Sequence, residues 1–404
     1  MKKSINTFLK HTAKDFHNQS VNPPVVRAST IIFKSLQDIR KMQKKYKKDP
    51  RGGHFDYGRQ GTSTTHILQK ILSELEESYH TFLTPTGFGS VFLAIFSIVR
   101  PGDEILVADP VYLPTRIFTE TFLKDFKIKT KFYDPHNLKT ITQNITSKTK
   151  LIFVESPGSN TFEFQDLSKI VKIAKSKKIF TVIDNTWATP YFFKPIKLGF
   201  DMSIVSATKY YSGHSDVMGG SLAVNKKAFK YVEQTNKITG LRLSPDDAYL
   251  ILRGLRTLDI RLEKHQANAK KVASFLSKNK KITLLYPYKK NSFNFKMWKK
   301  YYKGASGLMG LRIKSKNKNS IKKFVNSLKL FGHGYSWGGF ESLALHQEIV
   351  ERGFRSHLNL KKNEHIVRLH IGLEDAKDLI NDLKLIERKC NQKIKRKFSS
   401  EKIA

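Results

Sequence analysis

Between about residues 62 and 220, short apolar segments alternate with amphipathic segments, and this alternation is the strongest constraint on the fold. One amphipathic segment places Ile67, Leu68, Ile71, Leu72 and Leu75 on a single stripe, as a half-buried helix requires. Strands are predicted at 104–108, 151–154, 180–183 and 202–205, and helices at 66–77, 87–99 and 166–177. The alternation predicts an α/β fold with a largely parallel sheet.

The length predicts more than one domain, because 404 residues exceed the usual size of one hydrophobic core. Residues 1–58 are predicted to form an N-terminal arm that is irregular as far as about residue 55 and includes a solvated basic run at 41–48. Residues 59–245 are predicted as the larger domain. Residues 246–404 are predicted as a smaller α/β domain that begins with long helices (246–278) and ends in a basic tail.

The net charge of +39 is extreme, with 73 Lys and Arg against 34 Asp and Glu. Such a charge suits a polyanionic partner. The basic residues are spread along the chain, however, together with heavy use of Phe, Ile and Asn, which indicates compositional drift onto solvated faces. No helix-turn-helix, zinc-finger or RNA-binding aromatic motif is evident. We therefore expect no nucleic-acid partner, and a non-catalytic basic binding protein remains the alternative from another functional class.

Cys390 is the single cysteine, so an intramolecular disulfide and a cysteine metal cluster are both excluded. We expect no metal site. No apolar signal core follows the basic residues 1–4, and no apolar run approaches the ~20 residues that span a bilayer. We expect a cytoplasmic protein without a membrane partner.

The segment 206–216 carries the strongest chemical signal. Lys209 follows a predicted buried strand and stands behind the hydroxyls of Ser206 and Thr208. A desolvated lysine has a lowered pKa and forms Schiff bases. The two hydroxyls suit a phosphate, so the motif favours pyridoxal phosphate. On this motif alone, a surface lysine after a strand is the alternative.

Three further residues follow predicted strands or open a helix. Asp184 ends the strand at 180–183, where a carboxylate pairs with a protonated pyridine nitrogen or, alternatively, caps a turn. Gly87 opens a helix, whose free N–H groups suit an anion. Tyr112 suits stacking on a cofactor ring, with core packing as the alternative. Ligands bind at this edge of open α/β sheets.

Arg368 lies among apolar residues of a predicted strand late in the chain. A buried arginine needs an anionic partner. A substrate carboxylate, held by two parallel hydrogen bonds, is one candidate partner, and a structural salt bridge is the other.

Taken together, these residues resemble the Cys/Met-metabolism family of pyridoxal-phosphate enzymes, which have the aspartate aminotransferase type of fold. The resemblance extends from Val21-Asn22 and Arg27-Ala28-Ser29-Thr30 to the region of Arg368. The segment 206–216 is close to the family's cofactor-lysine signature. The family fold has a larger domain with a mostly parallel seven-stranded sheet between helices, followed by a smaller C-terminal α/β domain.

The resemblance implies a role for each site residue. Lys209 forms the Schiff base with the cofactor and moves protons, and Tyr112 stacks on the ring and assists the exchange of amines. Arg368 binds the substrate α-carboxylate. The cofactor is further held by Asp184, the amides of Gly87 and Phe88, and the hydroxyls of Ser206 and Thr208, whereas Ser336, Trp337 and Tyr57 line the substrate pocket.

Tyr57 and Arg59 resemble residues that reach the cofactor phosphate of a neighbouring subunit. The resemblance therefore implies a homo-oligomer, at least a dimer. The family is commonly a tetramer.

Within the family, the sequence follows the bacterial β-lyase pattern. Thr62-Ser63-Thr64 stands where many γ-class enzymes carry Asn-Pro-Thr, and Ser159-Asn160 stands where they carry Asn-Pro. The implied reaction is β-elimination of L-cystathionine, an amino-acid thioether, to homocysteine, pyruvate and ammonia in methionine biosynthesis. The open alternatives within the family are a cysteine or cysteine-conjugate β-lyase, a γ-lyase, a γ-synthase and a sulfhydrylase.

Overall fold

The computed structural model describes residues 4–12, 19–287, 290, 292–315, 317–348, 355–358 and 360–384. The predicted basic tail from Glu387, with Cys390, lies outside the described residues. Within the described part, no helix is long and apolar enough to cross a membrane.

A seven-stranded sheet forms the centre of the larger domain, in the order β1-β7-β6-β5-β4-β2-β3. All neighbouring pairs from β6 to β3 are parallel, whereas β7 runs antiparallel to both β1 and β6. The strands are β1 (His80–Thr84), β2 (Glu104–Ala108), β3 (Lys129–Tyr133), β4 (Thr149–Glu155), β5 (Phe180–Asp184), β6 (Met202–Val205) and β7 (Gly220–Val224). The predicted α/β fold with a mostly parallel seven-stranded sheet is confirmed.

Helices cover both faces of this sheet. In β2, Ile105 and Val107 belong to one hydrophobic cluster, and Leu106 and Ala108 belong to the other. Such a strand is apolar throughout because both of its faces are buried. The first cluster includes helices α4 (Gly87–Phe96), α5 (Leu113–Glu120), α6 (Phe122–Asp125) and α11 (Lys226–Thr239), and the second includes α3 (Ser63–Glu76), α7 (Lys139–Asn144), α8 (Leu167–Ser176), α9 (Thr189–Phe192) and α10 (Pro195–Leu198).

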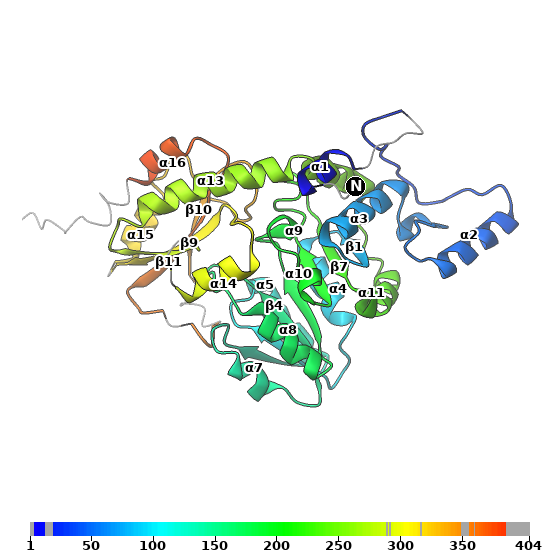
Figure 1. The fold of residues 1–404 in the computed structure, drawn as a ribbon, viewed down its shortest axis with the longest axis horizontal. Helices are drawn as coiled ribbons and strands as arrows, with labels where there is room; N and C mark the ends of the chain where they lie inside the picture. The colour runs from blue at the N-terminus through cyan, green and yellow to red at the C-terminus, as the bar shows by residue number, and fades with distance from the viewer. Residues whose placement is uncertain are drawn as a thin grey trace, which may run out of the picture.

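The smaller domain is built on a four-stranded antiparallel sheet of order β10-β11-β9-β8. Its elements are β8 (Ile282–Leu285), α14 (Phe293–Tyr301), β9 (Leu308–Lys314), α15 (Lys318–Val325), β10 (Leu343–Gln347), β11 (Glu364–His370) and α16 (Ala376–Leu383). The helical region predicted at 246–278 is observed as α12 (Pro245–Leu255) and α13 (Leu258–Leu276). Helix α13 runs along the top of the molecule into the smaller domain (Figure 1).

The N-terminal arm is more ordered than the sequence predicted. It contains α1 (Ile5–Lys10), α2 (Leu36–Lys48) and a short 3₁₀ turn, η1 (Gly58–Gln60). The expectation of an irregular arm was wrong for α2, which Ser35 caps by accepting a hydrogen bond from the Asp38 amide. The basic run at 41–48 is largely exposed, and no residue of α2 is buried. Figure 1 shows α2 projecting away from the body of the molecule.

Candidate active site

The polar residues meet at the carboxyl edge of the seven-stranded sheet. Glu155 ends β4 and Asp184 ends β5, and the two residues are paired in the parallel register. Lys209 follows β6, the next strand in the sheet. Because parallel strands end at a common edge, the fold brings these three side chains to one place.

Lys209 is mostly buried and lies against residues 336–338 of the C-terminal part of the chain. Its Nζ donates a 2.5 Å hydrogen bond to Oγ of Ser336 and stands 5.5 Å from the ring centroid of Trp337. Burial and the nearby positive charge of Arg368 lower the pKa of Lys209 to about 8, against the opposite effect of Asp184. An amine with this pKa is a competent nucleophile and base near neutral pH.

The loop that carries Ser336 has an unusual backbone. Ser336 has a φ of 78°, which is uncommon for a residue other than glycine. Gly338 packs so closely that a Cβ there would lie 3.0 Å from the Lys209 Cα. Strained backbone of this kind persists where the surrounding structure fixes a functional geometry.

Arg368 is the fifth residue of β11 and lies beside the same Ser336 loop. Its Nη2 donates a 3.0 Å hydrogen bond to the Ser336 carbonyl. Among the described residues, no carboxylate forms an ion pair with it. Burial lowers the pKa of Arg368 to about 10, which is the response of a cation without an anionic partner. The salt-bridge alternative is therefore not observed in the described part of the chain.

Asp184 is held in place by the turn that follows β5. The Thr186 amide donates a 2.9 Å hydrogen bond to its Oδ1, and the Thr186 hydroxyl accepts one from the Ser206 amide. Burial raises the pKa of Asp184, although Thr186 and Lys209 act in the opposite direction. A cation placed against this carboxylate would restore its ionised form.

Gly87 and Phe88 form the first turn of α4, beside Ser206. The Thr86 side chain caps the helix by accepting the Gly89 amide, so the amides of Gly87 and Phe88 lie outside the helical ladder. A Cβ on Gly87 would lie 2.4 Å from Ser206 Oγ, so only glycine fits there. The arrangement suits an anion at a helix N-terminus.

Thr208 lies in the turn after β6, two residues from Ser206. Its hydroxyl bonds to the amide and carbonyl of Gly219, at 3.0 and 3.2 Å. The hydroxyl is thus anchored within the chain at the same end of the sheet.

Tyr112 is the N-cap of α5 and is 48% exposed. Its amide donates a 2.7 Å hydrogen bond to Oε2 of Glu155. Burial, Glu155 and Asp184 raise the pKa of the Tyr112 phenol, and Arg368 opposes them, so these groups face one another. The phenol is therefore neutral at physiological pH.

The structure does not bring Tyr57 and Arg59 to this site within one chain. Tyr57 is 43% exposed and bridges to Thr30, and Arg59 donates to the Lys237 carbonyl. Across the described residues, no hydrogen bond, ion pair or ring contact joins either side chain to Lys209.

Two site residues were not identified from the sequence as functional. Glu155 ends a predicted strand as Asp184 does, and this position was the available signal. Burial and the neighbouring Asp184 raise its pKa well above the usual value, which favours the neutral form of Glu155. Thr186 was also missed, although a threonine two residues after an aspartate is a common turn pattern.

The residues present fit a phosphorylated pyridine aldehyde. The free amides at the start of α4 lie beside the Ser206 hydroxyl, no ion pair joins a cation to Asp184 among the described residues, and Lys209 is desolvated. In contrast, the described residues contain no group of three or more His, Cys, Asp or Glu arranged to hold a metal ion. The fold and this site are those of an enzyme that uses pyridoxal phosphate.

Comparison with known proteins identifies the class further. The model of the family "Cys/Met metabolism PLP-dependent enzyme" matches residues 6–385. A putative cystathionine beta-lyase of Rhizobium johnstonii is 38% identical over 387 residues, covering 94% of each chain. An L-alanine/L-glutamate racemase of Wolbachia pipientis is 38% identical over 372 residues, covering 90% of this chain and 91% of the relative.

Among solved structures, the cystathionine gamma synthase of Xanthomonas oryzae pv. oryzae, in complex with aminoacrylate and cysteine, is similar with a TM-score of 0.86. It is 27% identical, and the match covers 96% of this chain and 99% of that one. The chain therefore belongs to the Cys/Met metabolism family of PLP-dependent enzymes.

Proposed function

We propose that the protein is a carbon–sulfur lyase that cleaves L-cystathionine by β-elimination, as a step in methionine biosynthesis. The observation that carries the proposal is that Lys209 Nζ and Arg368 Nη2 both bind Ser336, one through its hydroxyl and the other through its carbonyl. This arrangement places a base and a cation suited to a carboxylate side by side. The preference for the β-reaction is supported by Thr62-Ser63 and Ser159, and by the Rhizobium relative.

In this proposal, Lys209 holds the cofactor aldehyde carbon and Asp184 contacts the protonated pyridine nitrogen. The amides of Gly87 and Phe88 and the hydroxyls of Ser206 and Thr208 bind the phosphate, with Tyr112 against the ring. Pyridoxal phosphate, when bound, withdraws electrons from the substrate Cα and so makes its proton acidic.

The remaining chemistry falls to residues of this chain. Arg368 binds the substrate α-carboxylate, and Ser336 and Trp337 line the pocket beside it. Lys209 Nζ, freed when the substrate amine takes its place, removes the Cα proton. The Cα–H electron pair then forms the Cα=Cβ bond as the Cβ–S electron pair leaves with the homocysteine thiolate. Water then releases pyruvate and ammonia. Asp184 stays ionised throughout and fixes the charge of the ring.

The test is the identity of the keto acid formed from L-cystathionine by the holoenzyme. Pyruvate with homocysteine would support the proposal. 2-Oxobutyrate with cysteine would overturn it and assign the chain to the γ-lyase branch. Lys209→Ala serves as the inactive control, and Lys197→Ala, at a mostly exposed lysine of α10, serves as the matched active control. Parallel incubation with L-cysteine separates the cysteine-lyase alternative.

A second candidate activity is racemisation of L-alanine or L-glutamate. The observation that favours it is the 38% identity with the Wolbachia racemase over 372 residues, which equals the identity with the Rhizobium relative. Racemisation starts with the same proton removal by Lys209 but returns a proton to the other face of Cα. Chiral chromatography after incubation with L-alanine tests it, since D-alanine must accumulate.

We also propose that the active unit is a homo-oligomer, at least a dimer and commonly a tetramer as in the family. The exposed Tyr57 and Arg59 support it, because in the proposal they complete the cofactor and substrate sites of a second chain. The proposed division into an arm (1–58), a larger domain (59–245) and a smaller domain (246–404) agrees with the two sheets. We propose a cytoplasmic location and no nucleic-acid partner, and size-exclusion chromatography with light scattering tests the oligomeric state.

A further inference from the structure

A buried carboxylate next to the site is bound by both domains. Asp109 directly follows β2 and has no exposed surface. It accepts hydrogen bonds from Arg116 Nη1 at 3.0 Å and from Arg355 Nε at 2.7 Å. The amides of Ser356 and His357 also donate to it, at 2.8 and 3.1 Å. Burial alone would raise the pKa of Asp109, but Arg355 and these amides hold it below its usual value.

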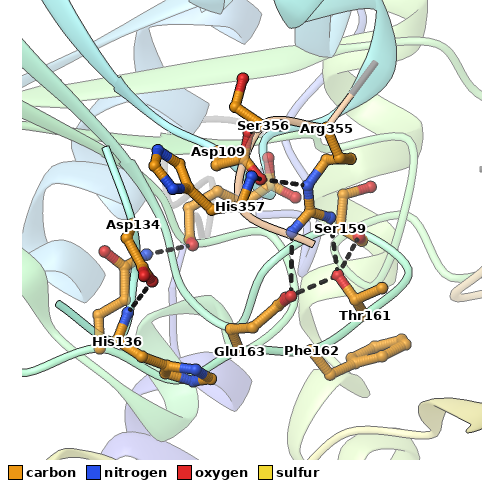
Figure 2. A network of polar contacts seen from close by, with 12 residues as sticks. Asp109, Asp134, His136, Ser159, Thr161, Phe162, Glu163, Arg355, Ser356 and His357 are labelled. Carbon is orange, nitrogen blue, oxygen red and sulfur yellow. Dashed lines mark hydrogen bonds and ion pairs between the residues drawn. The ribbon is translucent and has the colours of Figure 1, made fainter. Parts of the chain in front are cut away.

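Arg355 uses every nitrogen of its guanidinium within this cluster. Nε binds Asp109, Nη1 donates to the Thr161 hydroxyl at 2.9 Å, and Nη2 pairs with Glu163 Oε1 at 3.0 Å. Figure 2 shows the guanidinium among these three side chains. Because each of its three nitrogens already binds a protein oxygen, Arg355 is engaged with the protein and not with a substrate. Arg355 instead connects two parts of the same chain.

The two loops that Arg355 joins are already packed against each other. Asp109 belongs to the loop after β2, and Thr161 and Glu163 belong to the loop after β4. The Ser159 amide donates to the Pro110 carbonyl at 2.6 Å. Together they form one surface at the carboxyl edge of the large sheet, and Arg355 reaches that surface from the smaller domain.

The residues on either side of this contact belong to the active site. Tyr112 is three positions after Asp109, and Arg368 lies in β11, the strand that follows Arg355 in the chain. The charge of Arg355 also opposes the rise in the pKa of Glu155, whose side chain accepts the Tyr112 amide. The contact of Arg355 with Asp109 therefore connects the segment that leads into β11, which carries Arg368, to the loop that carries Tyr112.

We propose that Arg355 is a positioning residue that sets Arg368 at the correct distance from Tyr112 and Lys209 by tying the smaller domain to Asp109 and Glu163. The inference rests on the proposed role of Arg368 in binding the substrate carboxylate. It predicts that loss of Arg355 weakens binding of the amino acid and leaves the cofactor in place.

The first measurement is the dissociation constant of L-alanine for the holoenzyme, read from the visible absorbance of the bound cofactor. L-Alanine carries the α-carboxylate but no sulfur leaving group, so the readout is independent of whether cystathionine is the substrate. Arg355→Gln is expected to raise this constant about tenfold, because small displacements of a binding group cost at least that much. The cofactor absorbance and its retention on dialysis are expected to stay unchanged.

Lys300→Gln is the matched control. Lys300 of α14 pairs with Asp166, the N-cap of α8, at 3.1 Å and so also joins the two domains, but away from Tyr112 and Arg368. It is expected to leave the dissociation constant unchanged. An equal effect of both variants would show that domain contacts in general matter, and would overturn the proposal.

A double-mutant cycle tests whether Arg355 acts through Arg368 or independently of it. If Arg355 acts through Arg368, Arg355→Gln adds little to the effect of Arg368→Lys, whereas independent effects would add. Additive effects, an unchanged constant in Arg355→Gln, or loss of the cofactor from that variant would each overturn the inference. Failure of the proposed function would instead appear as absence of pyruvate from the wild-type enzyme.

Discussion

The carboxyl edge of the seven-stranded sheet and the N-terminal arm place their candidate functional residues in different environments. At the sheet edge, Lys209, Asp184 and Arg368 are surrounded by protein, and their pKa values are shifted by burial. In the arm, Ile32 is 90% exposed and Leu36 is 75% exposed, and no residue of α2 is buried. The buried residues at the sheet edge all come from one chain, whereas the arm presents exposed apolar side chains of the kind that mark an interaction surface.

The largest expected effect tests the sheet edge. Lys209→Ala should lower the turnover of L-cystathionine by at least about 10³-fold, because it removes both the cofactor linkage and the base. Tm should change little, since the Lys209 side chain belongs to the site and is not part of the hydrophobic core. Steady-state pyruvate release and a thermal melt measure the two quantities. Residual turnover within tenfold of wild type would contradict the role assigned to Lys209.

The next effect tests whether the arm serves a second chain. Arg59→Ala should weaken cofactor retention, although the described contacts of the Arg59 side chain in its own chain are with Lys237 and Tyr57 and not with Lys209. Arg59→Ala and Lys209→Ala chains, each nearly inactive alone, should regain about a quarter of wild-type activity when they are co-expressed at equal amounts. Half of the dimers are then mixed, and each mixed dimer has one intact site out of two.

Activity that does not recover in the mixed sample would place Arg59 in the site of its own chain. The control is the mixture of Lys209→Ala with Asp184→Asn chains. Both residues belong to one site in the same chain, so every site of a mixed dimer lacks one of them and that mixture should stay inactive.

The same contrast explains what could be predicted from the sequence. The bounds of β2 and β6 were predicted correctly, because their residues are apolar on both faces. The edge strand β3 reads Lys-Thr-Lys-Phe-Tyr and is partly exposed, so its pattern does not differ from that of a loop. Helix α2 was missed although Leu36, Ile39, Met42 and Tyr46 have helical spacing, because its lysines dominate the composition.

Site residues could be predicted from the sequence only where they directly follow a predicted strand. Lys209 and Asp184 were found in this way, and the structure brings them together. The contacts of Arg355 with Asp109 and Glu163 join residues about 190 to 250 positions apart, and no local pattern indicates such a contact.

A third prediction concerns stability within the larger domain. Glu76 of α3 is buried, 3.4 Å from the Ser203 hydroxyl, and burial raises its pKa from the usual 4.5 to about 8. The folded chain therefore keeps a proton that the unfolded chain releases between these values. Its contribution to the free energy of unfolding is complete below pH 4.5 and falls as the pH rises to about 8, by at most about 1.4 kcal/mol per pH unit.

Glu76→Gln tests this assignment, because glutamine keeps the shape without the titration. Denaturant unfolding of both proteins at several pH values should show the variant gaining stability relative to wild type as the pH rises. A difference that stays constant with pH would mean that Glu76 is ionised in the folded chain.

The smallest effect is expected in the arm. Arg27 and Asp246 form a 2.5 Å ion pair in which both side chains are largely exposed, and exposed pairs contribute little to stability. Arg27→Gln should therefore leave the thermal midpoint unchanged within the error of the measurement. Melts at two protein concentrations sharpen the comparison between the two regions. A midpoint that falls only at the lower concentration would mean that a second chain covers this pair, so that the arm, like the sheet edge, is buried in the active enzyme.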